Sequence, residues 1–248
     1  ASATIPAGEL VALVGRNGTG KSTLLRAIAG FGERLGGEIR LDGLSLETLS
    51  PQQLATTVSF VTTERVRIPN LRCEDVVALG RAPYTNWIGR VQEQDKAIVE
   101  RSLELVGMAA FAGKTMDRMS DGECQRVMIA RALAQDTPII LLDEPTNHLD
   151  AESIDWLEQH LQQYKGTVIA VTHDRYFLDN VAGWILELDR GEGIPWKGNY
   201  SGWMEQKTTR MAMEEKQESK RRKTLERELE WVRMSPSCLL YTSPSPRD

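Results

Sequence analysis

A stretch of eight residues near the start of the sequence has the residue types and spacing that bind phosphate. Gly15–Ser22 reads Gly-Arg-Asn-Gly-Thr-Gly-Lys-Ser, which fits the pattern GxxxxGK followed by Ser or Thr. Small glycines allow successive backbone N–H groups to curl around phosphate oxygens, and the N-terminus of a following helix adds a partial positive charge. The sequence therefore predicts a loop that binds the phosphates of a nucleotide.

Two side chains of this loop have separate expected roles. Lys21 can reach the β- and γ-phosphates and assist catalysis there, and Ser22 can hold Mg²⁺. The context supports this interpretation, because an apolar run, Leu10–Val14, precedes the loop and a helical pattern, Lys21–Ala29, follows it. The expected nucleotide-binding residues of the loop are Gly15, Asn17, Gly18, Thr19, Gly20, Lys21, Ser22 and Thr23.

A pair of carboxylates follows a second apolar run. Ile139–Leu142 is followed by Asp143 and Glu144, and a strand that ends in this way delivers both acids to the carboxyl edge of a sheet, where ligands of open α/β folds bind. Asp143 is expected to bind Mg²⁺ through its coordination shell, and Glu144 to orient and deprotonate the attacking water. Such a pair alone commonly caps a helix, but the phosphate-binding loop favours the catalytic interpretation.

A histidine follows a third apolar run. His173 comes shortly after Thr167–Val171 and is flanked by Thr172 and Asp174. A single histidine at the end of a strand is usually structural. Here a third strand end carries a polar residue toward the same edge, so a catalytic role as a sensor of the γ-phosphate stays open beside the structural one.

These motifs lie on elements that alternate along residues 1–200. Short β-like runs alternate with helical patterns, which is typical of an α/β sheet with crossover helices. Ser120 and Glu123 form a capping box that opens a helix, and Asp42-Gly43 signals a hairpin turn. The expected strands are Leu10–Val14, Glu38–Leu41, Ile139–Leu142, Thr167–Val171 and Trp184–Leu188, and the expected helices are Lys21–Ala29, Glu93–Val106, one from Ser120 through Ala134, and one through Ile154, Leu157 and Leu161.

The last part of the sequence differs in composition. From Trp203 to Met234 there is no Gly or Pro, and residues 201–234 carry nine Lys/Arg against seven Asp/Glu. This pattern predicts a long, exposed, charged helix that serves as a linker or arm after a nucleotide-binding domain at 1–200. Residues 235–248 are rich in Ser and Pro without periodicity, so we expect a disordered tail that is foreign to the natural protein.

The overall composition argues against several classes of protein. The 248 residues are 41% hydrophobic with a net charge of −5, and no apolar run reaches the length of a membrane span. Cys73, Cys124 and Cys238 lie far apart without CxxC spacing, which argues against a disulfide framework and for reduced thiols in the cytoplasm. The acidic body, residues 1–200, argues against broad nucleic-acid binding by that part.

Taken in order, the motifs resemble those of the ATP-binding cassette (ABC) ATPases over about residues 4–200. The resemblance implies a P-loop NTPase fold, with a RecA-like core and a helical signature subdomain, that hydrolyses ATP with Mg²⁺. It also implies that two cassettes, as a dimer or in tandem, sandwich two ATP molecules. By the same resemblance, the motifs are the Walker A loop Gly15–Ser22, the signature Met119–Glu123, the Walker B pair Asp143 and Glu144, the D-loop Asn147–Asp150 and the switch histidine His173.

Within the signature, the resemblance gives Ser120 and Gly122 a contact with the γ-phosphate that is bound by the opposite Walker A loop. Three features depart from the family pattern. The sequence begins at Ala1 without the strand and the adenine-stacking aromatic residue of the family. Thr63 stands where the family has the glutamine of the Q-loop, so that a shorter hydroxyl is left to meet Mg²⁺. The signature also contains carboxylates, at Asp121 and Glu123, close to the expected triphosphate charge.

The two halves of the sequence resemble different branches of the family. Residues 4–140 resemble the ATPase subunits of iron-siderophore and cobalamin importers. Residues 141–234 resemble the ABC-F branch, in which the helix after the cassette touches the ribosome and tRNA. We therefore expect a mosaic chain, joined near Leu141–Asp150, where both branches carry nearly the same stretch. The importer-like stretches are Thr63–Arg65, Leu79–Tyr84 and Ser120–Glu123, and the ABC-F-like stretches are Glu144–Asp150, His173–Asp179 and Gly193–Tyr200.

Three functions remain open on the sequence alone. The first is a cytoplasmic ABC-F ATPase that contacts the ribosome or tRNA through residues 201–234. The second is the ATPase subunit of an importer, peripheral to the inner membrane, that docks on a permease through residues 64–118. The third is a nucleotide-binding switch without catalysis, which the substitution at Thr63 and the missing adenine platform favour.

Overall fold

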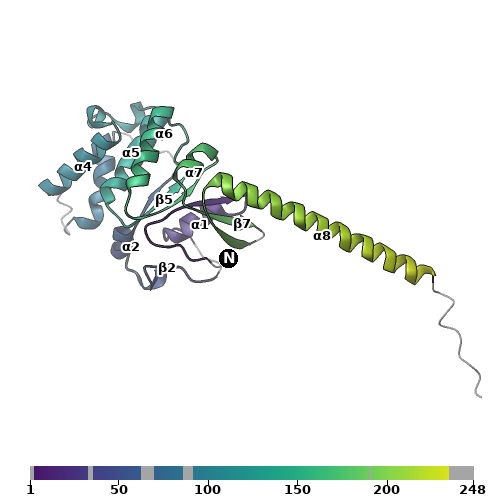
Figure 1. The fold of residues 1–248 in the computed structure, drawn as a ribbon. Coiled ribbons are helices and arrows are strands. Elements are labelled where there is room, and N and C mark those ends of the chain that lie inside the picture. Colours follow the sequence, from purple (N-terminus) through teal and green to yellow (C-terminus); the bar gives the residue numbers. More distant parts are fainter. Residues whose placement is uncertain (1–2, 33–35, 63–69, 86–91, 190, 235–248) are drawn as a thin grey trace, which may run out of the picture. The chain divides into compact units, whose positions relative to one another are not determined.

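The computed structural model describes residues 3–32, 36–62, 70–85, 92–189 and 191–234 (Figure 1). The chain divides into two units, Ala1–Tyr200 and Ser201–Asp248. The expected metal ligand Thr63 and the expected tail 235–248 lie outside the described residues.

A six-stranded, mostly parallel sheet forms the centre of the first unit. Its inner strands are nearly continuous runs of Val, Ile, Leu and Ala, which is typical of strands that are buried on both faces. The last strand in the order runs antiparallel to its neighbour, and all other neighbours are parallel. The strand order is β4 (Val58–Val61), β5 (Ile139–Asp143), β6 (Thr167–Val171), β1 (Leu10–Gly15), β7 (Trp184–Asp189) and β8 (Glu192–Lys197).

Helices and a small hairpin pack around this sheet. Leu25 of α1 is fully buried against Val11, Leu13 and Leu141 of the sheet. In the hairpin, Asp42 and Gly43 both have positive φ, 49° and 79°, which is the two-residue turn that matches the twist of antiparallel strands. The elements are α1 (Lys21–Ile28), the hairpin β2 (Arg40–Leu41) and β3 (Leu44–Ser45), the 3-10 turn η1 (Leu46–Thr48), α2 (Pro51–Thr57), α6 (Ala151–Gln163) and α7 (Arg175–Val181).

A helical region is inserted between β4 and β5, and Figure 1 shows its helices α4 and α5 gathered to one side of the sheet. A buried ion pair ties it together, because Arg81 Nε donates to Asp95 Oδ1 at 2.9 Å and its Nη1 donates to the carbonyl of Ala134 at 2.9 Å. The hydrogen bond from Arg81 lowers the pKa of Asp95. The elements are α3 (Cys73–Ala78), the 3-10 turns η2 (Leu79–Tyr84), η3 (Ala109–Phe111) and η4 (Met116–Arg118), α4 (Glu93–Leu105) and α5 (Asp121–Gln135).

The second unit consists of the long helix α8 (Tyr200–Met234). Its described side chains are mostly exposed, and Leu225 and Leu229 are 58% and 50% accessible. Among the described residues, no helix combines the length and the apolar character needed to cross a bilayer.

The expected α/β fold is confirmed, and each strand or helix that was expected with stated bounds is present within one or two residues at its ends. The helix expected through Ile154, Leu157 and Leu161 spans Ala151–Gln163. The capping box of α5 is also confirmed, since both reciprocal bonds between Ser120 and Glu123 are formed. Helices α2, α3 and α7 and the two edge strands β4 and β8 were not foreseen from the sequence.

Candidate nucleotide site

The three polar motifs lie at one edge of the sheet. Strands β5, β6 and β1 are neighbours and parallel, so their carboxyl ends are adjacent. The loop Gly15–Gly20 follows β1, Asp143 ends β5, and His173 comes two residues after β6. The topology therefore assembles the phosphate loop, the carboxylates and the histidine at a single place.

The loop between β1 and α1 positions Lys21. Its Nζ donates to the carbonyl oxygens of Gly15 at 3.0 Å and Arg16 at 3.1 Å, and the side chain is largely buried. Gly18 and Gly20 have φ values of 80° and 88°, a region that favours glycine over other residues. Asn17, Gly18, Thr19, Ser22 and Thr23 are exposed.

The hydroxyl group of Ser22 and the carboxylate of Asp143 form a hydrogen bond. Ser22 Oγ donates to Asp143 Oδ1 at 2.9 Å, although the two residues are 121 positions apart. Asp143 is buried at the end of β5, beside Val171 of β6. Hydroxyl and carboxylate oxygens are hard ligands of the kind that Mg²⁺ takes in nucleotide sites. The third expected metal ligand, Thr63, is not among the described residues.

Glu144 and His173 lie against each other. Glu144 Oε1 is 3.4 Å from His173 Nε2, and Glu144 Oε2 accepts a hydrogen bond from the backbone N–H of His173 at 3.3 Å. The Glu144 side chain is 19% exposed, against 64% for His173. Because Asp174 caps α7 by accepting from two backbone N–H groups, the turn that carries His173 is fixed.

The backbone of Glu144 is held in an unusual conformation. Its φ is 50°, in the left-handed region that non-glycine residues seldom adopt. Its N–H donates to the carbonyl of Val171 at 2.7 Å, and this bond aims the residue toward β6. Strain of this type is retained only where the surroundings fix it, and it is concentrated at functional sites.

The signature residues form the N-terminus of α5. Ser120 Oγ accepts from the N–H of Glu123 at 3.2 Å, and Glu123 Oε2 accepts from the N–H of Ser120 at 2.7 Å and lies 3.4 Å from Lys114 Nζ. The backbone bond from Ser120, followed by the smaller effects of its hydroxyl and of Lys114, lowers the pKa of Glu123. The Glu123 carboxylate is therefore hydrogen-bonded at the start of its own helix and lies beside Lys114. The sequence had suggested a carboxylate close to the charge of the triphosphate.

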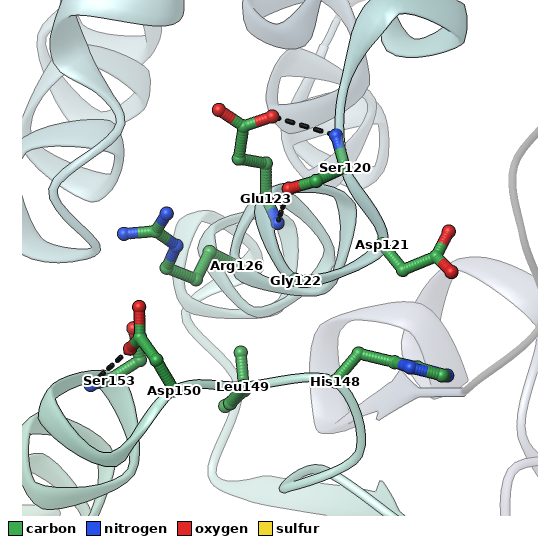
Figure 2. A pocket seen from close by; sticks show the side chains of 9 residues that line it. All are labelled: Ser120, Asp121, Gly122, Glu123, Arg126, His148, Leu149, Asp150 and Ser153. Carbon is green, nitrogen blue, oxygen red and sulfur yellow. Dashed lines mark hydrogen bonds between the residues drawn. The ribbon is translucent and has the colours of Figure 1, made fainter.

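The signature and the D-loop share one pocket of about 290 Å³. Figure 2 shows the signature turn on one side of this pocket and the segment His148–Asp150 on the other. The Lys21 loop does not line this pocket. The lining residues are Ser120, Asp121, Gly122, Glu123, Arg126, His148, Leu149, Asp150 and Ser153.

Two members of this pocket, Arg126 and His148, were not singled out from the sequence. Arg126 lies four residues after Gly122, so helical spacing alone would have placed both on one face of α5. His148 falls inside the expected D-loop, but no local pattern in the sequence predicts its positive φ of 66°.

Comparisons with known proteins place these motifs in context. A family model described as ABC transporter matches residues 1–147, and a second model with the same description matches residues 186–237. The energy-dependent translational throttle protein EttA of Haemophilus influenzae is 44% identical over 250 residues, which cover 92% of this chain and 45% of that protein. The chain thus spans less than half the length of this curated relative.

Solved structures agree with the fold. The dimeric structure of a bacterial ABC transporter cassette matches with a TM-score of 0.69 and 31% identity, over 79% of this chain and 88% of that one. A metal-chelate type ABC transporter in an inward-facing conformation matches with a TM-score of 0.66 and 26% identity, over 78% of this chain and 73% of that one.

Proposed function

The chain belongs to the ABC transporter family, and from this premise we propose that it is an ABC-F ATPase that hydrolyses MgATP to drive a step of translation. The observation that carries the proposal is the 44% identity to a translational throttle protein over 92% of the chain. The match of a family model to residues 186–237 supports it, because that range includes the whole of α8.

The first step is nucleotide binding by the loop after β1. Backbone N–H groups at the start of α1 and the exposed side chains of Asn17 and Thr19 face the solvent where the triphosphate binds. The ammonium group of Lys21 is held by two carbonyls of the same loop, from which it can pass to the β- and γ-phosphates over a short distance.

Mg²⁺ fits the residues at this site. Ser22 and Asp143 already bring two oxygens together, and these two residues would hold the ion. Mg²⁺ in nucleotide sites usually takes its further ligands from phosphate and water. When bound, Mg²⁺ supplies charge neutralisation along the triphosphate.

Hydrolysis needs a base and a group that senses the γ-phosphate. Glu144 follows the Mg²⁺ ligand Asp143 directly, and its carboxylate can accept a proton from the attacking water. His173 Nε2 lies 3.4 Å from Glu144 Oε1, so the same imidazole can hold the carboxylate in place and contact the γ-phosphate. We assign Glu144, His173 and Lys21 the catalytic roles.

A complete site needs a second cassette. Ser120 and Gly122 line a pocket that does not include the Lys21 loop, which supports a role for them at the nucleotide of another cassette. ABC cassettes form dimers, and the 31% identical cassette is itself dimeric in its solved structure. The partner is either a second chain or a second cassette in a longer polypeptide.

The proposed target of α8 is the ribosome, which the chain would meet in the cytoplasm. The exposed basic run of α8, Lys220–Lys223, suits contacts with RNA phosphates, although acidic residues are interleaved nearby. The test is co-sedimentation of the full chain with ribosomes in the presence of ATP. Recovery of the chain only in the supernatant, at low and moderate salt, would contradict the proposal.

A second candidate is the ATPase subunit of an iron-siderophore or cobalamin-type importer, peripheral to the inner membrane, that docks on a permease through residues 64–118. The similarity to a metal-chelate type transporter favours it. Co-purification with a permease, set against co-sedimentation with ribosomes, separates the two candidates. A multiple-turnover ATPase assay separates both from a nucleotide-binding switch that does not hydrolyse ATP.

A further inference from the structure

The signature and the D-loop of the same chain touch through their backbones. A Cβ built on Gly122 would overlap the carbonyl oxygen of His148 and lie 3.5 Å from its carbonyl carbon. Figure 2 shows Gly122 at the turn that faces the segment from His148 to Leu149. Since packed backbones yield little, only glycine fits at this position without displacing the D-loop.

The D-loop joins His148, which Gly122 contacts, to the proposed general base Glu144, which lies four residues earlier in the sequence. The N–H of Asn147 donates to the carbonyl of Glu144 at 3.2 Å, and the N–H of Leu149 donates to the carbonyl of Thr146 at 3.2 Å. On the other side, the hydroxyl groups of Thr146 and Thr172 lie 2.9 Å apart and share a hydrogen bond. The loop is therefore a short, internally bonded link, and a shift at His148 is passed on to Glu144.

Both ends of this link are strained. Glu144 has a φ of 50° and His148 a φ of 66°, and each non-glycine residue in this region is unfavourable unless its neighbours hold it. The D-loop is also anchored beyond His148, because Asp150 caps α6 by accepting from the N–H of Ser153 at 2.9 Å. Under such strain, loss of one restraint lets the loop relax to another conformation.

We propose that Gly122 is a positioning residue for the general base of its own chain: its lack of a side chain seats the D-loop against the signature and thereby fixes Glu144. The inference rests on the proposed ATPase function, and it adds a role in cis to the contact with the γ-phosphate of the opposite cassette. One glycine then links the two ATP sites, because it belongs to the signature of one and supports the base of the other.

Hydrogen exchange on the full chain tests the contact without a dimer. In Gly122→Ala, the amides of Asn147 and Leu149 should exchange at least about tenfold faster, since the added methyl displaces the loop that protects them. Ser120→Ala is the matched control, because it changes the same signature without adding volume, and its exchange at these amides should stay as in the unsubstituted chain. Unchanged exchange in Gly122→Ala would overturn the inference.

Kinetics test the consequence for the base. Gly122→Ala should lower kcat while KM for MgATP stays within about twofold, because the Lys21 loop is untouched. Direct titration of MgATP into the variant checks that it is folded. A Gly122→Ala chain that no longer binds MgATP would also overturn the inference, since the contact would then hold the fold and not the base.

Mixed dimers separate the role in cis from the role in trans. When Gly122→Ala is mixed with Glu144→Gln before ATP is added, each mixed dimer has one site with an unsubstituted Glu144 and an unsubstituted opposite signature. If Gly122 acted only in trans, turnover would recover to about a quarter of normal, because half of randomly formed dimers are mixed and each has one complete site of two. We expect no recovery, because the intact Glu144 in that site belongs to the chain with the displaced D-loop.

The control mixture is Ser120→Ala with Glu144→Gln, for which recovery to about a quarter is expected. Equal recovery in both mixtures would overturn the inference, and if neither mixture recovers, the exchange rates at Asn147 and Leu149 decide. If the proposed ATPase function is wrong, the outcome differs from both of these results. The unsubstituted chain would then show no turnover, while hydrogen exchange would still report whether Gly122 holds the D-loop.

Discussion

The ammonium group of Lys21 illustrates how one residue is prepared for its task by the backbone around it. Its two acceptors, the carbonyls of Gly15 and Arg16, belong to the proposed phosphate-binding loop. The carbonyl bonds hold the cation close to the position where negative charge arrives, so little reorganisation is needed. The same logic applies to Ser22 and Asp143, whose mutual bond brings the two proposed Mg²⁺ ligands together.

Replacement of Lys21 should therefore weaken nucleotide binding. We expect Lys21→Ala to lose roughly 10²-fold in MgATP affinity, because a charge-assisted hydrogen bond to phosphate contributes about 2–3 kcal/mol. Fluorescence titration with a labelled ATP analogue measures this loss. Lys96→Ala, in an exposed part of α4, is the control and should bind as the unsubstituted chain does; equal affinity of both variants would sink the assignment of the loop.

Replacement of Glu144 should separate binding from hydrolysis. Glu144→Gln keeps the shape of the side chain but removes the base, so turnover should fall by about 10²-fold or more while ATP affinity is retained. The uncleaved ATP should then favour a dimer, which light scattering detects. Glu152→Gln, at an exposed position of α6, is the control. Turnover at the normal rate in Glu144→Gln, or turnover per chain that does not depend on protein concentration, would count against the assignment.

At the scale of elements, the sequence predicted those with strong local signals. Leu10–Val14 and Ile139–Leu142 are short runs of large apolar residues, and Ser120 with Glu123 marks a helix start, so these features were identified from the pattern alone. The strand β8 was missed because Pro195 and three glycines lie in or directly beside it. Proline is tolerated there because β8 is an edge strand that has a partner on one side only.

The candidate site was foreseen by residue type, while its contacts were not. The phosphate loop, the acid pair and the histidine follow from motifs at strand ends. The capping bonds of Ser120 and Glu123 were also foreseen, because they are local to the start of α5. The contact of Gly122 with His148 and the presence of Arg126 in the signature pocket depend on how α5 packs beside the D-loop. Periodicity and turn chemistry do not encode such a distant packing arrangement.

The buried pair of Arg81 and Asp95 should carry much of the stability of the helical region. Asp95→Asn leaves the guanidinium without its charged partner, and we expect a loss of about 2 kcal/mol in the free energy of unfolding. Denaturant unfolding measures the loss. Glu93→Gln, whose side chain is 87% exposed, should change the free energy by less than about 0.5 kcal/mol. A loss in Asp95→Asn no larger than in this control would contradict the assignment.

The same pair predicts a dependence on pH. The pKa of Asp95 is lowered in the folded state, mainly by the hydrogen bond from Arg81. A carboxyl group with a lowered pKa stabilises the folded chain above its unfolded pKa, about 3.9, and this contribution is lost as the pH falls through the folded value. The difference in unfolding free energy between the unsubstituted chain and Asp95→Asn should therefore be full at neutral pH and shrink below about pH 4. A difference that stays constant across this range would show that the charge of Asp95 is not involved.

At the scale of the whole molecule, the sheet interleaves the two halves of the sequence. Strand β1 comes from the first half and lies between β6 and β7 of the second, and β4 of the first half pairs with β5. Every inner strand thus depends on residues from both sides of Leu141–Asp150. A junction at this place is compatible with folding if the facing strands need apolar side chains of the right volume and do not need particular residues. The Val, Ile, Leu and Ala residues of these strands meet that condition.

We keep the prediction that the chain is a mosaic joined near Leu141–Asp150. Surface residues and core residues respond differently to such a joint. The inner strands need mainly apolar volume of the right size, whereas the proposed permease-docking region 64–118 and the proposed ribosome-binding helix α8 would serve different partners. ATP binding should therefore survive, and α8, which lies wholly on one side of the joint, should still bind the ribosome. The coupling of hydrolysis to either partner should be impaired, because neither partner surface is whole. Amplification of the codons for residues 120–170 from source DNA tests the joint directly. We expect no contiguous product, and repeated recovery of one invariant product that spans 120–170 would refute the mosaic and leave the region 64–118 and α8 as parts of one natural protein.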